Sequence, residues 1–338
     1  MSNSPLVSII IVNYNGKKYL NECLTSLFNQ TYRNFEIILV DNKSSDDSVN
    51  FVRSNFGDSI LLIQSDTNVG FAAGCNIGIR ASKGDLICLF NQDAIADKEW
   101  LSTLVYVIQS DEDIAGVAGK LYYWGDKYGR DAVFCTWSKV DPYTAGAYNF
   151  YKGDEPISKV DYLTGAAMLV KKEAIKKIGL LDPEYFLFFD ETEWCARMIR
   201  ASYDLVYVPQ AIAWHVVSAS LPDSNLKLYY MNRSRMRFAL KNFDLSYLPI
   251  YFTFFAVESI FDLVNAVRHR NFFAVAKIIA RVLIWNLVHL RHTISLRRAD
   301  FKLLQNSSRP LRSYNRSLPL KEYKIGRLER YLKILFGR

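Results

Sequence analysis

Cysteine and histidine are scarce in this chain, with five cysteines and four histidines among 338 residues. The cysteines are odd in number and scattered, and no two of them form a Cys-x-x-Cys pair. Neither a disulfide framework nor a zinc site is therefore indicated. A reducing cytosol fits this pattern best. The five positions are Cys23, Cys75, Cys88, Cys135 and Cys195.

Two phosphate-binding signatures and a secretion signal are also absent. No Gly-x-Gly-x-x-Gly motif follows the first predicted strand and no Walker A loop occurs, which disfavours a nicotinamide enzyme and a P-loop NTPase. The segment Met1 to Pro5 is short and polar and leads directly into a strand, without the basic, apolar and cleavage regions of a signal peptide. We therefore expect the folded part of the chain to face the cytoplasm.

Acidic residues are rare in the last third of the chain. Residues 227–338 hold 22 Lys and Arg against 6 Asp and Glu, so this part has a charge of about +16 and the preceding part about −8. Such a split suggests an acidic, cation-using part joined to a basic part that meets an anionic surface. Nucleic acid and membrane both qualify at this stage.

No clean apolar span of membrane-crossing length occurs in the basic part. The runs 247–267 and 272–290 are interrupted by Glu258 and Asp262 in the first and by Lys277 and Arg281 in the second. Amphipathic helices lying on an anionic membrane fit these runs. A helical domain packed on the rest of the chain, or a homodimer contact, is an open alternative, and the basic tail 309–338 is expected to order only on a surface.

The first 120 residues alternate between apolar runs and helical patterns. This β-α-β-α order predicts a parallel sheet with right-handed crossovers. Residues 121–160 lack periodicity and suggest a loop or hairpin region over the sheet edge. The expected strands are 6–12, 35–40, 59–64, 85–90, 114–120, 162–170, 186–189 and 204–208, and the expected helices 17–28, 47–54, 70–81, 98–109, 172–178 and 193–201.

The stretch 85–94 places a carboxylate at the end of a buried strand. Its apolar run stops at Asn91, Gln92 and Asp93. Because ligands of open α/β sheets bind beyond the carboxyl ends of the strands, Asp93 is a site candidate. The alternative is that these residues only cap the helix expected to start near Asp97.

Three further features in the first hundred residues suggest a nucleotide pocket. Asn13, Tyr14 and Asn15 follow one strand, Asp41 follows the neighbouring strand, and the stretch 68–76 places glycine and small residues at a helix N-terminus. Backbone N–H groups at such a terminus suit phosphate, and a strand-end carboxylate can accept from a base or ribose. Ordinary turn chemistry could explain each feature singly.

A cluster of acids, Asp190, Glu191 and Glu193, follows the aromatic run 186–189. Carboxylates so close together repel, so at least one should have a raised pKa, as a general base at a pocket wall requires. The alternative, helix capping, explains Glu193 well but does not account for the aromatic run 186–189. His215 follows another apolar stretch and is a structural hydrogen bonder or, with Asp93 and two phosphates, part of a divalent cation shell.

Taken together and in order, these segments resemble the family 2 glycosyltransferases of the GT-A fold, and most closely the rhamnosyltransferase-like and galactofuranosyltransferase-like branch. The resemblance covers about residues 5–240. It rests on seven motifs: VSIIIVNYNG (7–16), VDNKSSDDS (40–48), NVGFAAGCNIG (68–78), NQDA (91–94), LTGAAMLV (163–170), FFDETEWCAR (188–197) and WHVVSAS (214–220).

The resemblance implies an α/β GT-A type fold, with a mostly parallel Rossmann-like sheet and flanking helices, as a catalytic domain over 1–240. The helical, basic region 241–338 is then an extension that contacts a membrane surface or another copy. Site roles carry over by position. The catalytic residue is Glu191 or its rival Asp190; the metal ligands are Asp93 and His215; the nucleotide-binding residues are Asn13, Tyr14, Asn15, Asp41, Asn68, Gly70, Phe71, Asn76 and Asn91; and the acceptor residues are Thr164, Gly165, Glu193 and Trp194.

The same resemblance implies an inverting transfer of a sugar from a nucleotide diphosphate donor to a hydroxyl of a glycan or lipid-linked saccharide, with Mg²⁺ or Mn²⁺ as cofactor. Asn91 replaces the first acid of the family's Asp-x-Asp motif, so Asp93 is the only carboxylate there. The first donor expected is dTDP-rhamnose, with a galactofuranosyl or other UDP-sugar as the alternative. We expect the enzyme to act in cell-surface polysaccharide synthesis and to be peripheral at the inner face of the membrane.

Two other classes of protein fit the sequence less well than a sugar transferase. A nucleotide or nucleic-acid binding protein without transferase activity would place basic and aromatic residues at the pocket, whereas the strand ends here are acidic and the basic charge is remote, so nucleic acid is not an expected partner. A nucleotidyltransferase would need a basic Gly-rich loop after the first strand, and it gives the acids 190–193 no function.

Overall fold

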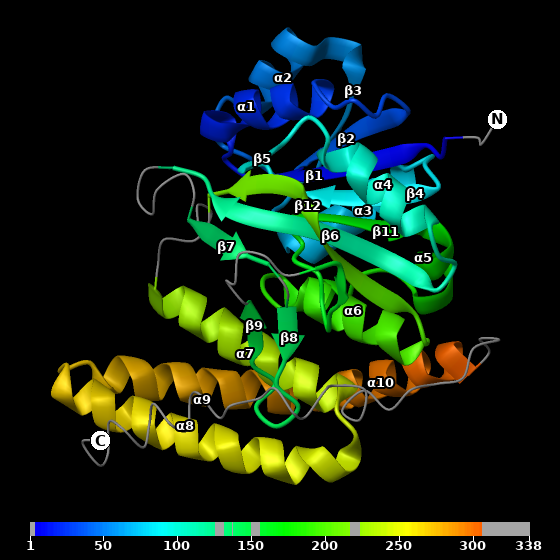
Figure 1. The fold of residues 1–338 in the computed structure, drawn as a ribbon. Coiled ribbons are helices and arrows are strands. Elements are labelled where there is room, and N and C mark those ends of the chain that lie inside the picture. Colours follow the sequence, from blue (N-terminus) through cyan, green and yellow to red (C-terminus); the bar gives the residue numbers. More distant parts are fainter. Residues whose placement is uncertain (1–3, 126–131, 137, 150–155, 217–223, 306–338) are drawn as a thin grey trace.

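A computed structural model describes residues 4–125, 132–136, 138–149, 156–216 and 224–305 (Figure 1). The basic tail 309–338 lies outside the described residues, as do the last four residues of the motif 214–220.

The fold is built on a ten-stranded sheet with the order β10-β12-β6-β11-β4-β1-β2-β3, to which β5 and β7 add at β12 and β6. The strands β3, β2, β1 and β4 are parallel, and β11 runs antiparallel between β4 and β6. The sheet is therefore mostly parallel on its N-terminal side and mixed on the other. Its strands are β1 (Val7–Asn13), β2 (Phe35–Asp41), β3 (Ile60–Gln64), β4 (Leu86–Phe90), β5 (Ala94–Ala96), β6 (Ile114–Tyr123), β7 (Val133–Cys135), β10 (Ser158–Lys159), β11 (Ala167–Lys171) and β12 (Asp204–His215).

Helices cover both faces of this sheet. Along β1, Val7, Ile9 and Ile11 belong to the core shared with α1 and α4, whereas Ile10 belongs to the core shared with α3, α5 and α6. This alternation follows from the two-residue period of a strand, and it explains why the first strands carry apolar residues on both faces. The helices are α1 (Lys17–Phe28), α2 (Ser48–Phe56), α3 (Gly70–Ala81), α4 (Trp100–Gln109), α5 (Lys172–Ile178) and α6 (Asp190–Arg200).

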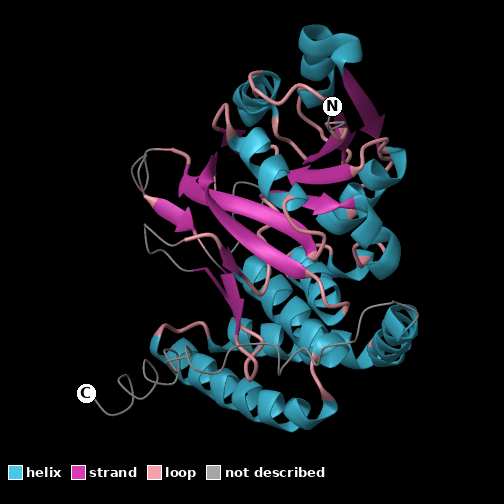
Figure 2. Cartoon of the chain, turned by 45° about the vertical axis from the view of Figure 1, so that its right-hand side comes forward, coloured by secondary structure: helices cyan, strands magenta, loops and turns pink. Residues whose placement is uncertain are grey.

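The C-terminal helices form a layer below the sheet (Figure 2). In this layer α7 packs against α6, α9 and α10, and α8 and α9 lie side by side as a hairpin. A separate two-stranded sheet, β8 (Ser138–Val140) with β9 (Ala147–Asn149), lies near this layer. The helices are α7 (Ser224–Asn242), α8 (Leu248–Arg268), α9 (Phe272–Val288) and α10 (Leu290–Gln305), and short 3-10 turns cover Gly57–Ser59, Pro183–Tyr185 and Leu245–Tyr247.

The predicted α/β fold is confirmed, with parallel strands on the N-terminal side of the sheet and mixed strands beyond them. The helices expected at 17–28, 70–81 and 172–178 have those bounds. The hairpin expected within 121–160 is β8 and β9. Two expectations are wrong in detail. The run 186–189 is not a strand, because Phe186, Phe188 and Phe189 have φ values of 54°, 63° and 64°, in the left-handed region. The last strand does not stop at residue 208 but continues to His215, where it pairs with the unpredicted β5.

Candidate active site

The carboxyl ends of β1 and β2 meet at Asn13 and Asp41, which are register partners. Asn13 Nδ2 donates to Asp41 Oδ1 at 2.8 Å and to Ser44 Oγ at 3.0 Å, and the N–H of Ser44 donates to Asp41 Oδ2 at 3.0 Å. Asn13 Oδ1 is buried and has no partner among the described residues. Asn13 and Asp41, both predicted to hold the nucleoside, are thus brought together, and Asn13 Oδ1 remains free to accept a hydrogen bond from a ligand.

Tyr14 and Asn15 form the turn after β1. Asn15 has φ 51°, and its side-chain oxygen accepts from the N–H groups of Ser45 at 2.7 Å and Asp46 at 3.3 Å. Gln92 clamps the backbone of Tyr14: its Oε1 accepts from the Tyr14 N–H at 2.7 Å and its Nε2 donates to the Tyr14 carbonyl at 3.2 Å. Gln92 was not among the predicted site residues. Gln92 could have been predicted from its position next to Asp93, at the end of a buried strand.

The glycine-containing loop before α3 is shaped by the run 186–189. Asn68 Oδ1 accepts from the N–H of Gly70 at 3.0 Å, and the N–H of Phe71 donates to the Phe186 carbonyl at 3.0 Å. Gly70 has φ 83°, and a Cβ there would lie 2.6 Å from Phe186 Cδ2, so only glycine fits. Asn68, Gly70 and Phe71 therefore lie where they were expected, at the start of the helix.

Asn76 does not support the predicted nucleotide contact. Its Nδ2 donates to the Leu181 carbonyl at 2.8 Å and its Oδ1 accepts from the Leu181 N–H at 3.0 Å. The side chain is buried and ties α3 to the segment before α6. Its position two turns into the helix explains this, because the free N–H groups of a helix lie only in its first turn.

Asn91, Asp93 and His215 converge on one point beyond β4. Ala94 and His215 are register partners of β5 and β12, which brings the imidazole beside the carboxylate. His215 Nε2 lies 3.2 Å from Asp93 Oδ1 and 3.1 Å from Asn91 Nδ2. Asp93 and His215 are both buried, and His215 Nδ1 has no partner in the described part of the chain.

The donor set at this point fits a hard divalent cation that is held partly by substrate. Mg²⁺ is usually bound through one or two carboxylates plus substrate phosphates, rather than by an all-protein cage. Nowhere in the described ranges do three or more His, Cys, Asp or Glu side chains gather as metal ligands. A nitrogen such as Nε2 cannot donate to Asp93 and accept from Asn91 at once, so the three groups are not mutually satisfied. A cation between Asp93 and His215 would remove that conflict.

Asp190 and Glu191 begin α6, directly after the residues with left-handed backbone. Burial raises the pKa of Asp190 well above its usual range, and the neighbouring charge of Glu191 and a hydrogen bond with it act in the same direction. Glu191 is only partly buried. Asp190 therefore keeps a proton to a higher pH than an ordinary carboxyl, whereas the Glu191 side chain is partly open to solvent.

The two halves of the site meet between β4 and β11. The N–H of Asn91 donates to the Ala166 carbonyl at 2.9 Å. A Cβ on the adjacent Gly165 would lie 3.5 Å from Glu191 Cβ and 3.4 Å from Phe71 Cε1. The predicted base, the glycine loop and the strand that carries Asp93 therefore surround Gly165.

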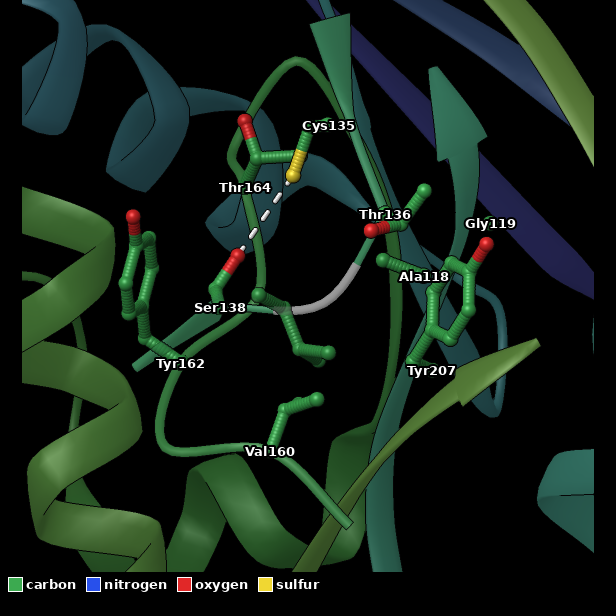
Figure 3. Close-up of a pocket in the computed structure, with 10 residues that line it drawn as sticks. Ala118, Gly119, Cys135, Thr136, Ser138, Val160, Tyr162, Thr164 and Tyr207 are labelled. Carbon is green, nitrogen blue, oxygen red and sulfur yellow. Dashed lines mark hydrogen bonds between the residues drawn. The ribbon is translucent and has the colours of Figure 1, made fainter. Parts of the chain in front are cut away.

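Thr164 lines a small cavity next to this point, large enough for about one water molecule (Figure 3). Tyr162 also lines it, and the pKa of Tyr162 is raised by its burial, with Cys135 and Glu191 as further causes. Thr164 is followed by Gly165, where an added Cβ would lie 3.5 Å from Glu191 Cβ, so the cavity is close to the predicted base. Its other lining residues are Ala118, Gly119, Cys135, Thr136, Ser138, Val160, Leu163 and Tyr207.

Glu193 and Trp194 do not lie on an acceptor surface, because both are fully buried. Glu193 pairs with Arg197 at 2.9 Å and with Lys241 at 3.0 Å, and these cations outweigh its burial and lower its pKa. Trp194 Nε1 donates to the Gly179 carbonyl at 2.9 Å. The expected acceptor role fails for these two residues because α6 turns them into the interior.

Comparison with known proteins identifies the family. The model of the glycosyl transferase family 2 matches residues 8–179. An uncharacterized glycosyltransferase of Haemophilus influenzae is 30% identical over 237 residues, which are 66% of this chain and 84% of that protein. The low-salt glycan biosynthesis hexosyltransferase Agl10 of Haloferax volcanii is 26% identical, over 73% of this chain and 80% of its own. Coverage varies: a match to another uncharacterized H. influenzae glycosyltransferase spans only 38% of that protein.

Solved structures show the same fold at low sequence identity. GalNAc-T7 with UDP, GalNAc and Mn²⁺ has a TM-score of 0.60 at 16% identity, over 75% of this chain and 50% of that one. The mannosyltransferase PcManGT of Pyrobaculum calidifontis with GDP-Man and Mn²⁺ has a TM-score of 0.52 at 15% identity, over 90% and 87%. With the strand-end site and the family match, these likenesses lead to one conclusion: the chain is a glycosyltransferase of family 2 with a GT-A type fold.

Proposed function

We propose that this enzyme transfers its sugar with inversion, in a single in-line displacement for which Glu191 is the general base. Glu191 takes the proton of the acceptor hydroxyl as that oxygen attacks the anomeric carbon, and the nucleoside diphosphate leaves from the opposite side. The observation that carries this proposal is the contrast within one helix start. Asp190 is buried, and this burial raises its pKa, whereas the partly exposed Glu191 lies beside Gly165 at the centre of the site.

We place a divalent cation, Mg²⁺ or Mn²⁺, between Asp93 and His215. The cation would offset charge that develops on the leaving diphosphate. The 3.2 Å approach of the two side chains and the conflict at His215 Nε2 support this site. GalNAc-T7 and PcManGT, which share the fold, each contain Mn²⁺ in their solved structures.

For the donor we propose a nucleotide sugar held over the ends of β1, β2 and β4. Asn13, Tyr14, Asn15 and Asp41 would hold the nucleoside, with the leftover Asn13 Oδ1 available to a donor group of the ligand. Solved structures of S. aureus TarS contain UDP and UDP-GlcNAc. Asn68, Gly70, Phe71 and Asn91 complete this side of the site. L-Rhamnose from dTDP-rhamnose is the first candidate, and a galactofuranosyl or other UDP-sugar is the second.

The acceptor we propose is a hydroxyl of a glycan or lipid-linked saccharide, presented at Thr164 and Gly165. The cavity beside Thr164 is close to Glu191, because an added Cβ on the neighbouring Gly165 would lie 3.5 Å from Glu191 Cβ. The related Agl10 is named for glycan biosynthesis, which supports the acceptor class. This role in surface polysaccharide synthesis fits the cytoplasmic location expected from the sequence.

A screen of nucleotide sugars tests the donor proposal. Thermal stabilisation and sugar release are measured for dTDP-rhamnose, UDP-sugars and GDP-mannose, each with Mg²⁺, Mn²⁺ or a chelator. We expect one nucleotide class to stabilise the protein only when a cation is present. In Asp93→Ala this cation-dependent stabilisation should be lost. Asp58→Ala, at an exposed carboxylate before β3, is the matched control. Stabilisation by a nucleotide without turnover of any sugar donor would favour a binding protein that has lost transferase activity.

A further inference from the structure

Large apolar side chains are exposed along the α8–α9 hairpin. Phe273 is 86% exposed and Leu287 and Val288 are each 71% exposed, far above what side chains of this kind show in a packed interior. Large exposed apolar side chains gathered on two helices that pack side by side indicate an interaction site. The exposed set on the two helices is Ile250, Phe252, Ile260, Val264, Val267, Phe272, Phe273, Leu283, Ile284, Leu287 and Val288.

These side chains follow the helical period and form one stripe on each helix, which we call the apolar face. On α8, residues 260, 264 and 267 are spaced by four and three; on α9, the exposed Ala280 with residues 284 and 287 repeats this spacing, and residue 273 lies seven residues, or two turns, before Ala280. The opposite sides of the helices, with Tyr251 and Phe255 on α8 and Val282 on α9, are buried in the protein. The apolar face therefore points away from the rest of the molecule.

Cations surround the apolar face. Arg268 and Arg270 lie at the turn between the helices, Lys277 lies within the α9 stripe, and Arg291 follows its end; all four are exposed. On α8 and α9 the acids are Glu258, which is buried, and Asp262. An apolar stripe with basic flanks matches the chemistry of an anionic bilayer surface. A second copy of the chain would instead bring like charges together.

The contacts of α8 with α7 favour a helix that lies on the membrane over one that crosses it. Among the described residues, Leu245–Arg268 is long and apolar enough to cross a membrane, and the bent pair Phe272–Val288 with Leu290–Leu303 passes the same test. However, Arg235 Nη2 on α7 pairs with Glu258 at 2.7 Å, with both side chains nearly buried. Insertion of α8 would break this pair and leave two charges unpaired, which is strongly unfavourable.

From these observations we infer that the apolar face is a docking surface for an anionic lipid bilayer. The apolar side chains enter the boundary between headgroups and acyl chains while Arg270, Lys277 and Arg291 meet the phosphates. This inference goes beyond the proposed function, because it holds whichever sugar is transferred. If the acceptor is lipid-linked, docking would also hold the active site at a fixed distance from the membrane, since α7 connects the hairpin to α6.

The test uses the full chain and vesicles of phosphatidylcholine, alone or mixed with phosphatidylglycerol, with binding measured by co-sedimentation. The variant Ile284→Glu with Leu287→Glu should bind mixed vesicles roughly tenfold more weakly or worse, because two apolar groups leave the interface and two acids enter it. Leu61→Glu with Tyr106→Glu, on exposed apolar residues of β3 and α4, should bind like the wild type. Thermal unfolding of each variant checks that the fold is kept.

A second variant separates the charge contribution. Arg270→Gln with Lys277→Gln should weaken binding roughly fivefold for each cation removed, and only for the mixed vesicles. Lys98→Gln with Lys176→Gln, on exposed lysines elsewhere, is the control. Equal binding by the wild type and the apolar-face variant would overturn the inference. So would light scattering that shows a dimer which this variant turns into a monomer, because the occupant would then be a second copy. Neither result bears on donor turnover, which is measured separately without vesicles.

Discussion

Asp190 and Glu191 are adjacent in sequence, but the structure gives them different surroundings. Asp190 is buried, and one of its carboxyl oxygens has no partner among the described residues. Glu191 lies at the edge of the site, beside Gly165. A protonated Asp190 next to the proposed base can donate a hydrogen bond without adding a second charge. This division of roles could not be predicted from the sequence, because it depends on which side of α6 each residue faces.

The raised pKa of Asp190 predicts a pH dependence of stability. The folded state keeps a proton that the unfolded chain, with an ordinary carboxyl pKa of 3.8, has released. The stabilisation is therefore complete below that pKa and is lost as the pH rises toward the raised value. We expect the free energy of unfolding to fall more steeply with rising pH, above the unfolded pKa of 3.8, in the wild type than in Asp190→Asn.

Urea denaturation across this range measures the difference. Asp58→Asn, at an exposed acid, should keep the wild-type slope. Equal slopes for the wild type and Asp190→Asn would show that Asp190 is ionised in the folded state. Asp182 does not interfere in this window: Lys241 and Arg237 outweigh its burial and lower its pKa to about 2, so its contribution is lost only as the pH falls toward that value.

The sequence motifs alone were sufficient to predict where the residues at the strand ends lie. Asn13, Asp41, Asp93 and His215 lie where the motifs placed them, because the end of a parallel strand is fixed by the apolar run before it. The motifs did not predict that the side chains of Asn76, Glu193 and Trp194 are buried. All three lie within helices, where the burial of a side chain depends on partners that are remote in the sequence, such as Leu181 and Lys241.

At the scale of elements, the run 186–189 connects the two sides of the site. Its aromatic composition predicted a strand, but three of its residues have left-handed backbone and its carbonyl at Phe186 caps the start of α3. Such a conformation costs of order 1–3 kcal/mol per residue and is maintained only by surrounding contacts. Those contacts include Arg233 from α7, whose Nη2 donates to the Glu184 and Tyr185 carbonyls. Local propensity cannot predict a shape that is imposed from outside the segment.

Gly70 tests this connection. Gly70→Ala places a methyl group against Phe186 at a backbone angle that alanine disfavours, so we expect a loss of about 2 kcal/mol or more of unfolding free energy and weaker nucleotide binding. Gly57→Ala is the matched control, because Gly57 also has a positive φ, 49°, but nothing lies within 4 Å of the added Cβ. A cost for Gly70→Ala no larger than that of the control would show that Phe186 moves freely and does not shape the loop.

At the scale of the whole molecule, a buried ion cluster joins the C-terminal helices to α6. Lys241 Nζ lies 3.0 Å from Asp182 Oδ2, 3.0 Å from Glu193 Oε1 and 3.2 Å from Asp300 Oδ2. Arg237 also pairs with Asp182 at 3.0 Å. The predicted boundary between 1–240 and 241–338 stays a prediction, but it falls in the last turn of α7, and these contacts cross it.

Lys241→Met should therefore destabilise the protein by about 3 kcal/mol or more, because the buried Asp182 and Glu193 and the partly buried Asp300 lose their shared cation. It should also lower transfer, since Glu193 is half a turn from Glu191 on the same helix. Lys17→Met removes an exposed pair with Asp47 at 2.7 Å and should leave stability almost unchanged. Chemical denaturation of both variants makes the comparison. An equally small effect of the two would show that the cluster does not couple the layers.

The central claim is that Glu191 is the base of a sugar transfer, and its most direct test is turnover of the donor identified by the screen in Glu191→Gln and Asp190→Asn. Glu191→Gln should lower kcat by a factor on the order of 10² to 10⁴, with nucleotide binding and thermal stability kept. Asp190→Asn resembles the protonated carboxyl and should stay within about tenfold of the wild type. Near wild-type turnover by Glu191→Gln, or loss of activity only in Asp190→Asn, would contradict the account.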